Sequence, residues 1–136
     1  MPSKILHDTT ILLVEDDERF RPILTTYLIS LGAKVAECRN FFEAKEHMGR
    51  QGANLVLTDH QLPDGDGFKV MAEVRKYQFA SDRNVPVIAM SASGNTVGNQ
   101  RLSAAGFSSY LTKPFTPQQL IDTIHTALNS ADGTTP

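Results

Sequence analysis

The sequence predicts an α/β fold in which a doubly wound parallel sheet of five strands carries helices on both faces. Short apolar runs alternate five times with segments of helical spacing, which favours one parallel sheet with right-handed crossovers. The runs lack polar alternation, as is typical of strands that are covered on both faces. Several of them end in polar or charged residues, and the carboxyl ends of parallel strands are where such sheets bind ligands.

Length and composition fit one domain. We expect a single domain over residues 1–136, with a core from about 10 to 129 and a flexible tail over 130–136, because a chain of this length buries roughly two thirds of its unfolded surface. The 13 basic and 15 acidic residues give a net charge of -2 without a basic cluster, so neither nucleic acid nor a membrane is expected as a direct partner. One cysteine excludes an internal disulfide, and no segment resembles a signal peptide or a membrane span. These features favour a cytoplasmic protein.

The first strand covers residues 11–14 and runs directly into three acids, Glu15, Asp16 and Asp17. Apolar residues at helical spacing predict a helix over 20–31, with Asp17 as a candidate N-terminal cap and Gly32 as the stop.

Residues 34–38 predict a weaker strand, and Glu37 within it suits a position at the edge of the sheet. Asn40 and Glu43 have the spacing of a capping box, which predicts a second helix that ends near Gly49.

The third strand, residues 55–57, is the most apolar and runs into Asp59. It should therefore be central, with Asp59 at its carboxyl end, where α/β sheets bind ligands. A polar loop over 60–67 follows, and a third helix begins near Phe68.

Residues 87–90 predict the fourth strand, which ends at Ser91. The segment 92–106 is helical by position, but Gly94 and Gly98 each cost about 1 kcal/mol relative to Ala, so we expect this helix to be short or mobile.

The fifth strand, residues 110–112, ends at Lys113. Thr116 and Pro117 then open the last helix as its cap and first-turn proline, with Gln119 at the capping-box position.

Four of the five strand ends bring polar side chains to one edge of the sheet, and the second strand contributes nothing obvious. They are Glu15 and Asp16, Asp59, Ser91 and Lys113. Carboxylate oxygens suit a mainly hydrated Mg²⁺ ion, and a cation relieves the repulsion among three clustered acids. The same ion can bridge to a phosphoryl oxygen while the lysine and the serine bind the other oxygens.

These motifs together resemble the response regulator receiver domain of two-component signalling, over residues 10 to 129. The resemblance rests on ILLVEDDE at the first strand, LVLTDHQLPDGDGF at the third, MSA at the fourth, and AGFSSYL and LTKPF around the fifth. It implies the flavodoxin-like strand order 2-1-3-4-5.

The resemblance also implies a role for each site residue. Asp59 would be the phosphoacceptor, Lys113 the phosphate-binding lysine, and Ser91 and Tyr110 the switch residues. The metal ligands would be Glu15, Asp16, Asp59 and the backbone carbonyl of Gln61. The Lys113-Pro114 bond would be cis.

The implied function is that of a stand-alone receiver rather than an enzyme with a free substrate pool. A sensor histidine kinase or a histidine phosphotransfer protein would donate the phosphoryl group to Asp59 with Mg²⁺ as the cofactor. A downstream protein target would then read the phosphorylated surface, and the chain would promote only its own phosphorylation and dephosphorylation.

Other interpretations fit parts of the pattern. Asp59 alone is typical of a turn cap, and an aspartyl-nucleophile phosphotransferase or phosphatase would carry a second Asp where Gln61 stands. Asp64 and Asp66 have calcium-loop spacing, but Leu62 occupies the first ligand position and Pro63 interrupts the loop. Gly65-Asp66-Gly67 is only a fragment of a dinucleotide fingerprint, and the acids after the first strand would repel a flavin phosphate.

His60 follows the acceptor where the family usually has an apolar residue. A packed or solvated imidazole is favoured over a catalytic one, although a local base for acyl-phosphate hydrolysis is the alternative. By resemblance, Gln61 and Ser93 flank the path of the attacking water.

Overall fold

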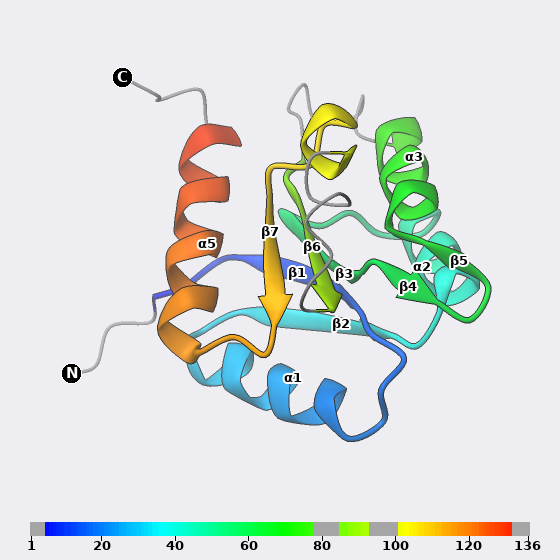
Figure 1. Cartoon of the computed structure of the whole chain (residues 1–136). Helices are drawn as coiled ribbons and strands as arrows, with labels where there is room; N and C mark the ends of the chain where they lie inside the picture. Colours follow the sequence, from blue (N-terminus) through cyan, green and yellow to red (C-terminus); the bar gives the residue numbers. More distant parts are fainter. Residues whose placement is uncertain (1–4, 78–84, 93–100, 132–136) are drawn as a thin grey trace.

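In the computed structural model, five parallel strands form one sheet with helices on both sides (Figure 1). The structure describes residues 5–77, 85–92 and 101–131. The elements in chain order are β1 (Thr10–Val14), α1 (Phe20–Ser30), β2 (Lys34–Cys38), α2 (Phe41–Met48), β3 (Leu55–Asp59), β4 (Gln61–Leu62), β5 (Gly65–Asp66), α3 (Gly67–Tyr77), β6 (Val87–Ala92), β7 (Ser109–Lys113) and α5 (Pro117–Ala131).

The strand order of the sheet is β2-β1-β3-β6-β7, and all four neighbouring pairs are parallel. The predicted order 2-1-3-4-5 is therefore confirmed, since β6 and β7 are the fourth and fifth strands of the prediction. The register sets Asp59 beside Met90, and Ser91 beside Thr112. One edge of the sheet thus collects the ends of β1, β3, β6 and β7.

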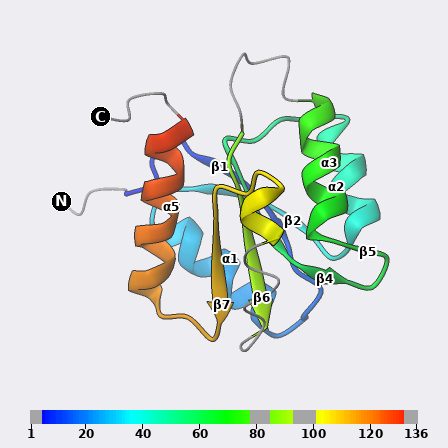
Figure 2. The ribbon, with the colours of Figure 1, turned by 45° about the horizontal axis from the view of Figure 1, so that its top comes forward.

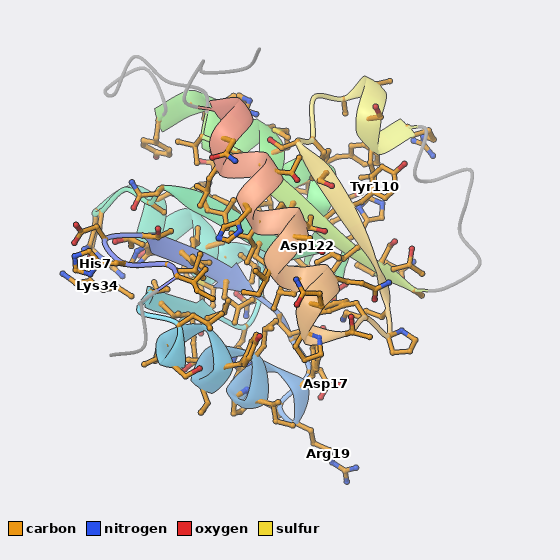
Figure 3. The ribbon with its side chains drawn as sticks, turned by 90° about the vertical axis from the view of Figure 1, so that its left-hand side faces the viewer. His7, Asp17, Arg19, Lys34, Tyr110 and Asp122 are labelled. Atoms are coloured by element: carbon orange, nitrogen blue, oxygen red, sulfur yellow. The ribbon has the colours of Figure 1, made fainter. Side chains whose placement is uncertain are left out.

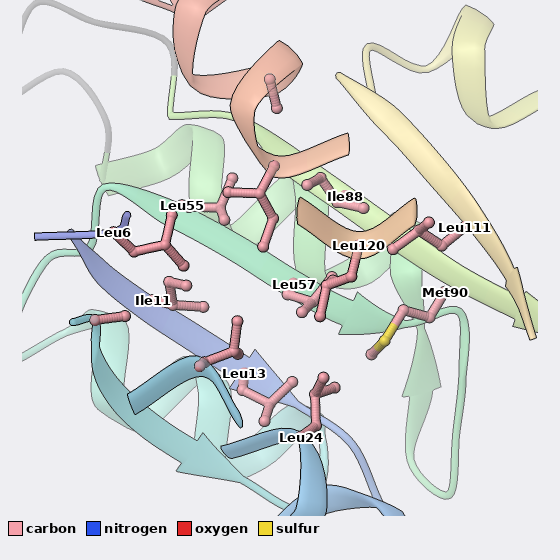
Figure 4. Close-up of a cluster of buried hydrophobic side chains, with 14 residues drawn as sticks. Leu6, Ile11, Leu13, Leu24, Leu55, Leu57, Ile88, Met90, Leu111 and Leu120 are labelled. Atoms are coloured by element: carbon pink, nitrogen blue, oxygen red, sulfur yellow. The ribbon is translucent and has the colours of Figure 1, made fainter. Parts of the chain in front are cut away.

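The strands bury side chains alternately on the two faces of the sheet. Each face therefore has its own hydrophobic core, which is covered by two helices. The face under α1 and α5 is packed with leucine, isoleucine and methionine, as Figure 4 shows. Its largest strand residues are Ile11, Leu13, Leu55, Leu57, Ile88 and Met90.

The opposite face packs against α2 and α3, which lie on the other side of the sheet in Figures 1 and 2. Its buried residues include Leu12, Val14, Val56, Val70, Val74, Ala89 and Phe107. Because both faces are covered, the strands carry continuous apolar runs without polar alternation.

The predicted helix ends are largely confirmed. Gly32 has a φ of 103°, a left-handed conformation that glycine adopts without steric cost, just after α1. Asn40 accepts the Glu43 amide, but Glu43 returns its bond to the amide of Arg39. At α5, Thr116 and Gln119 form both bonds of a capping box.

Three sequence expectations differ from the structure or lie outside it. The loop after Asp59 contains a two-stranded antiparallel hairpin, β4–β5, that no periodicity indicated. The helix α5 continues through Ala131, so the predicted tail is helical at its first two residues. Gly94, Gly98 and Ser93 lie outside the described residues. Of the predicted helix over 92–106, Ala92 belongs to β6, 101–104 are helical and 105–106 form a turn.

Candidate functional site

Three strand ends meet at the ammonium group of Lys113. Its Nζ lies 2.8 Å from Glu15 Oε1 and 3.3 Å from Asp59 Oδ2, although these partners are 98 and 54 residues away in the sequence. Carboxylate oxygens of Glu15, Asp16 and Asp59 all lie within 4.8 Å of one another. The structure thus assembles a cluster of three acids and one base at the carboxyl edge of the sheet.

Burial and crowding change the proton affinities in this cluster. Burial raises the pKa of Glu15, and repulsion by Asp59 adds to this effect, while the hydrogen bond from Lys113 opposes it. Burial and Asp59 likewise raise the pKa of Asp16. Burial alone would lower the pKa of Lys113, but the bond to Glu15 and the attraction of Asp59 outweigh it and leave the pKa raised.

The acid cluster fits a hard divalent cation such as Mg²⁺. The side-chain donors are all oxygen, and burial together with repulsion by Asp59 raises the pKa values of Glu15 and Asp16, so a cation would favour their ionised forms. Gln61 lies beside the cluster, since its amide donates to Asp59 Oδ1 at 3.2 Å. The role of its carbonyl as a metal ligand stays a prediction.

Ser91 lies in the same site, at the end of β6. Only 5% of its surface is exposed, and its Oγ has no hydrogen-bond partner within the described part of the chain. A buried polar atom without a partner is costly, so this hydroxyl is available to an incoming oxygen. It lines a cavity of about 470 Å³ with Asp16, Asp59, His60, Gln61, Leu62, Pro63, Ala92 and Lys113.

Tyr110 does not line this cavity. It sits on β7 beside Ala89, with 39% of its surface exposed, at a separate hollow of about 510 Å³ between β7 and α5 that Asp122 also lines. Figure 3 labels both residues on these two elements. Ser91 and Tyr110 are therefore on neighbouring strands but open to different hollows.

Arg21 is a site residue that the sequence prediction missed. This buried side chain donates to the backbone carbonyl of Glu15 at 2.9 Å, to Glu37 at 3.0 Å and to Glu18 at 2.7 Å. The second strand thus contributes Glu37 as a support beneath the acidic loop, which corrects the expectation that it contributes nothing. A cation on the inward face of α1, in line with Leu24 and Leu28, was the available signal.

Phe20 also contacts the site from α1 without having been predicted. Its ring lies 5.1 Å from Lys113 Nζ, a cation–π distance, and packs edge-on against Phe115 at 5.8 Å. The Lys113-Pro114 bond that precedes Phe115 is cis, as the resemblance implied.

His60 is packed among aromatic rings. Its ring meets Phe68 edge-on at 5.0 Å, and its Nδ1 is buried without a hydrogen-bond partner in the described residues. A Cβ at position 67 would lie 2.8 Å from that nitrogen, which explains the glycine there. These contacts support a packing role, and a role as a local base stays a prediction.

Asp64 and Asp66 cap helices. Asp64 accepts the amides of Phe41 and Phe42 at the start of α2, and Asp66 accepts the amide of Lys69 in α3. These carboxylates face two different helices, so the calcium-loop spacing is a coincidence. Asp17 likewise accepts the amides of Arg19 and Phe20, as predicted for a cap.

Comparison with known proteins identifies the family. The sequence model of the response regulator receiver domain matches residues 11–125. The transcriptional regulatory protein GltR of Pseudomonas aeruginosa is 32% identical over 125 residues, which are 92% of this chain and 51% of GltR. An uncharacterized 14.6 kDa protein of Leptolyngbya boryana is 34% identical over 111 residues, 82% of this chain and 83% of that protein. The chain thus spans about half of GltR but most of the second relative.

Solved structures agree with this result. A putative response regulator from Chloroflexus aurantiacus has a TM-score of 0.80 at 27% identity, covering 88% of this chain and 97% of that one. The Francisella response regulator 1452 receiver domain has a TM-score of 0.79 at 24% identity, covering 90% and 98%, and at this identity it supports the fold alone.

Receiver domains are phosphorylated by histidine kinases and bind Mg²⁺ through an acidic pocket, and the matched span contains every strand end of the site described above. Among the described residues, no helix is long and apolar enough to cross a membrane. By its sequence match, its strand order and its acidic cluster, the chain belongs to the response regulator receiver domain family of two-component systems.

Proposed function

We propose that Asp59 accepts a phosphoryl group from a phosphohistidine, carried by a sensor histidine kinase or a histidine phosphotransfer protein. The observation that carries this proposal is that Asp59 shares one cavity with an ammonium group and with a buried hydroxyl that has no partner among the described residues. Lys113 already bonds to Asp59, and Ser91 opens onto the same cavity. The cavity therefore offers an acceptor carboxylate and two donors for phosphoryl oxygens.

In the transfer, an oxygen of Asp59 bonds to phosphorus as the bond from phosphorus to the donor nitrogen breaks. The electron pair stays on the donor ring, which leaves as neutral imidazole when its other nitrogen is protonated. The Gln61 amide orients the Asp59 carboxylate, while Lys113 and Ser91 donate to phosphoryl oxygens. Mg²⁺, held by Glu15, Asp16, Asp59 and the carbonyl of Gln61, would supply the positive charge that neutralises the transferring group.

The output of this reaction is a change of surface rather than a released product. We infer a non-enzymatic receiver that turns over only its own acyl phosphate and signals to a downstream protein target. The proposal includes one receiver domain over residues 1–136, a cytoplasmic setting, and no direct contact with nucleic acid or membrane.

Labelling with a small phosphodonor tests the acceptor. In the presence of Mg²⁺, phosphoramidate should phosphorylate the protein at one hydroxylamine-labile position, and Asp59→Asn should abolish this labelling. Asp122→Asn, which changes an exposed acid on α5, is the matched control and should label like the unmodified protein. Labelling that persists in Asp59→Asn would refute the acceptor, and sustained hydrolysis of a free phosphoester would instead indicate an aspartyl-nucleophile phosphatase.

A further inference from the structure

We propose that Asp64 is a positioning residue for the metal site, because it anchors the β4–β5 hairpin to helix α2 and so holds Gln61 in place. This inference rests on the proposed function only in taking the Gln61 carbonyl as a metal ligand. Asp64, which the sequence pattern indicated only as a possible calcium ligand, thereby gains a role in positioning Gln61.

The Asp64 carboxylate binds the start of helix α2 with both of its oxygens. Asp64 Oδ1 accepts the Phe41 amide at 2.8 Å, and Oδ2 accepts the Phe42 amide at 3.0 Å. A negative charge at this position also interacts favourably with the positive, N-terminal end of the helix dipole. The two partners lie 23 and 22 residues before Asp64, so the bonds join two separate elements.

These bonds are not needed merely to begin the helix. The side chain of Asn40 already caps α2 by accepting the Glu43 amide at 2.8 Å. The amides that Asp64 binds are exposed, and water would satisfy them if the carboxylate were absent. The main effect of Asp64 is therefore to fix the hairpin relative to α2.

The hairpin connects Asp64 to Gln61 through only a few residues, so fixing Asp64 also fixes Gln61. Leu62 pairs with Gly65 and Gln61 pairs with Asp66, so Pro63 and Asp64 form the turn between them. At the other end, the Gln61 amide donates to Asp59 Oδ1. Gln61 is thus held between the acceptor carboxylate on one side and the anchored turn on the other.

Side-chain packing supports the same placement. Lys69 Nζ lies 4.7 Å from the centre of the Phe41 ring and 3.4 Å from the carbonyl oxygen of Asp64. A Cβ at position 65 would lie 3.0 Å from Lys69 Cδ and 3.4 Å from Phe41 Cβ, so glycine permits this close approach. Figure 1 shows the hairpin beside α2.

The test compares two acids of the same hairpin. Asp64→Ala should raise the Kd for Mg²⁺ by roughly 10-fold, since the loss of a supporting residue leaves a ligand poorly placed. Asp66→Ala removes a cap from α3 without touching α2, and its Kd should stay within about twofold of the unmodified value. Asp64→Asn keeps one acceptor oxygen and should recover part of the affinity. Thermal unfolding of each variant reports any loss of stability separately.

A second readout needs no metal. In the metal-free protein, Asp64→Ala should speed amide exchange at Gln61 as well as at Phe41 and Phe42, whereas Asp66→Ala should leave Gln61 unchanged. Equal Mg²⁺ affinities for Asp64→Ala and the unmodified protein, or equal losses in both alanine variants, would overturn the proposal. Labelling at Asp59 is scored independently with phosphoramidate, so a failure of the acceptor assignment is distinguishable from a failure of the anchor.

Discussion

At the scale of single residues, the pKa values of Glu15 and Asp16 are shifted in the opposite direction from the pKa of Asp17, the acid that follows them. Burial raises the pKa of both, with repulsion by Asp59 as a further cause. Two backbone amides, by contrast, lower the pKa of Asp17. Of the three consecutive acids, Glu15 and Asp16 therefore become protonated more readily than ordinary carboxyls, whereas Asp17 becomes protonated less readily.

This difference predicts how Mg²⁺ affinity depends on pH. The raised pKa values keep protons on Glu15 and Asp16 at pH values where ordinary carboxyls are ionised, so a cation must displace them. Mg²⁺ binding should therefore strengthen as pH rises above the ordinary carboxyl range, and it should release protons. Without the cation, the same pKa shifts affect the stability of the fold. The stability that they contribute is fully present below the ordinary carboxyl pKa, and it is lost as pH rises through the raised pKa values of Glu15 and Asp16.

Titration calorimetry in buffers of different ionisation enthalpy would measure both the Kd and the protons released. Asp17→Asn, next to the cluster, should leave the pH profile unchanged, because the pKa of Asp17 is lowered and its carboxyl is already ionised. An affinity that does not vary with pH would contradict the prediction.

The residues of the site differ in how far sequence alone could locate them. Glu15, Asp16, Asp59, Ser91 and Lys113 end strands, and parallel strands bring their carboxyl ends to one edge, so their meeting followed from the predicted topology. Arg21 and Phe20 act through a backbone carbonyl and a ring face. A cation on the inward face of α1 was a signal for Arg21, but no sequence pattern indicates the partner of either side chain.

At the scale of elements, helix α1 is tied to the sheet by a buried cation. Arg21 links α1 to the end of β1 through the carbonyl of Glu15 and to β2 through Glu37. Because one side chain supports two strands and the acidic loop, its loss should affect more than a surface ion pair would.

We predict that Arg21→Met will lower the free energy of unfolding by about 1–3 kcal/mol, since it leaves the carbonyl of Glu15 without its buried donor. Arg39→Met breaks an ion pair with Glu43 whose arginine is 61% exposed, and should lower the free energy of unfolding less, because solvent screens exposed ion pairs. Urea unfolding of both variants provides the comparison. A loss in Arg21→Met no larger than in Arg39→Met would show that burial adds nothing to this linkage.

Long elements were predictable, and short ones were not. The five main strands and the caps of α2 and α5 follow from apolar runs and capping pairs that span several residues. The strands β4 and β5 have two residues each, which is too short for a period to appear in the sequence. Their pairing is decided by contacts with α2 and with Asp59 instead.

At the scale of the whole molecule, Lys113 at the end of β7 lines both the cavity beside Asp59 and the hollow beside Tyr110. Ser91 lies next to Thr112 in the sheet, two residues from Tyr110 along β7. A phosphoryl group on Asp59 adds about two negative charges and attracts the Ser91 hydroxyl, which would vacate space near the strand end. An inward turn of Tyr110 would then bury apolar surface and reshape the face formed by β7 and α5.

This switch predicts a separation of phosphorylation from signalling. Ser91→Ala should still accept phosphate at Asp59, yet beryllofluoride should no longer raise amide protection over residues 101–112. Ser109→Ala, on the same strand as Tyr110, is the control and should respond like the unmodified protein. If activation of the unmodified protein leaves protection in that region unchanged, the signal does not pass through this face.

The wide spacing of the site along the chain has a consequence during synthesis. Chains emerge from the ribosome amino end first at about 5–20 residues per second, and Glu15 and Asp59 appear well before Lys113. β7 carries that lysine, and among the described strands it comes last in the chain and pairs with β6. Before β7 emerges, the chain lacks the ammonium group that bonds to Glu15 and Asp59 in the complete sheet. Under the proposed function, the phosphoryl site is therefore complete only once β7 has docked against β6, because Lys113 lies on that strand.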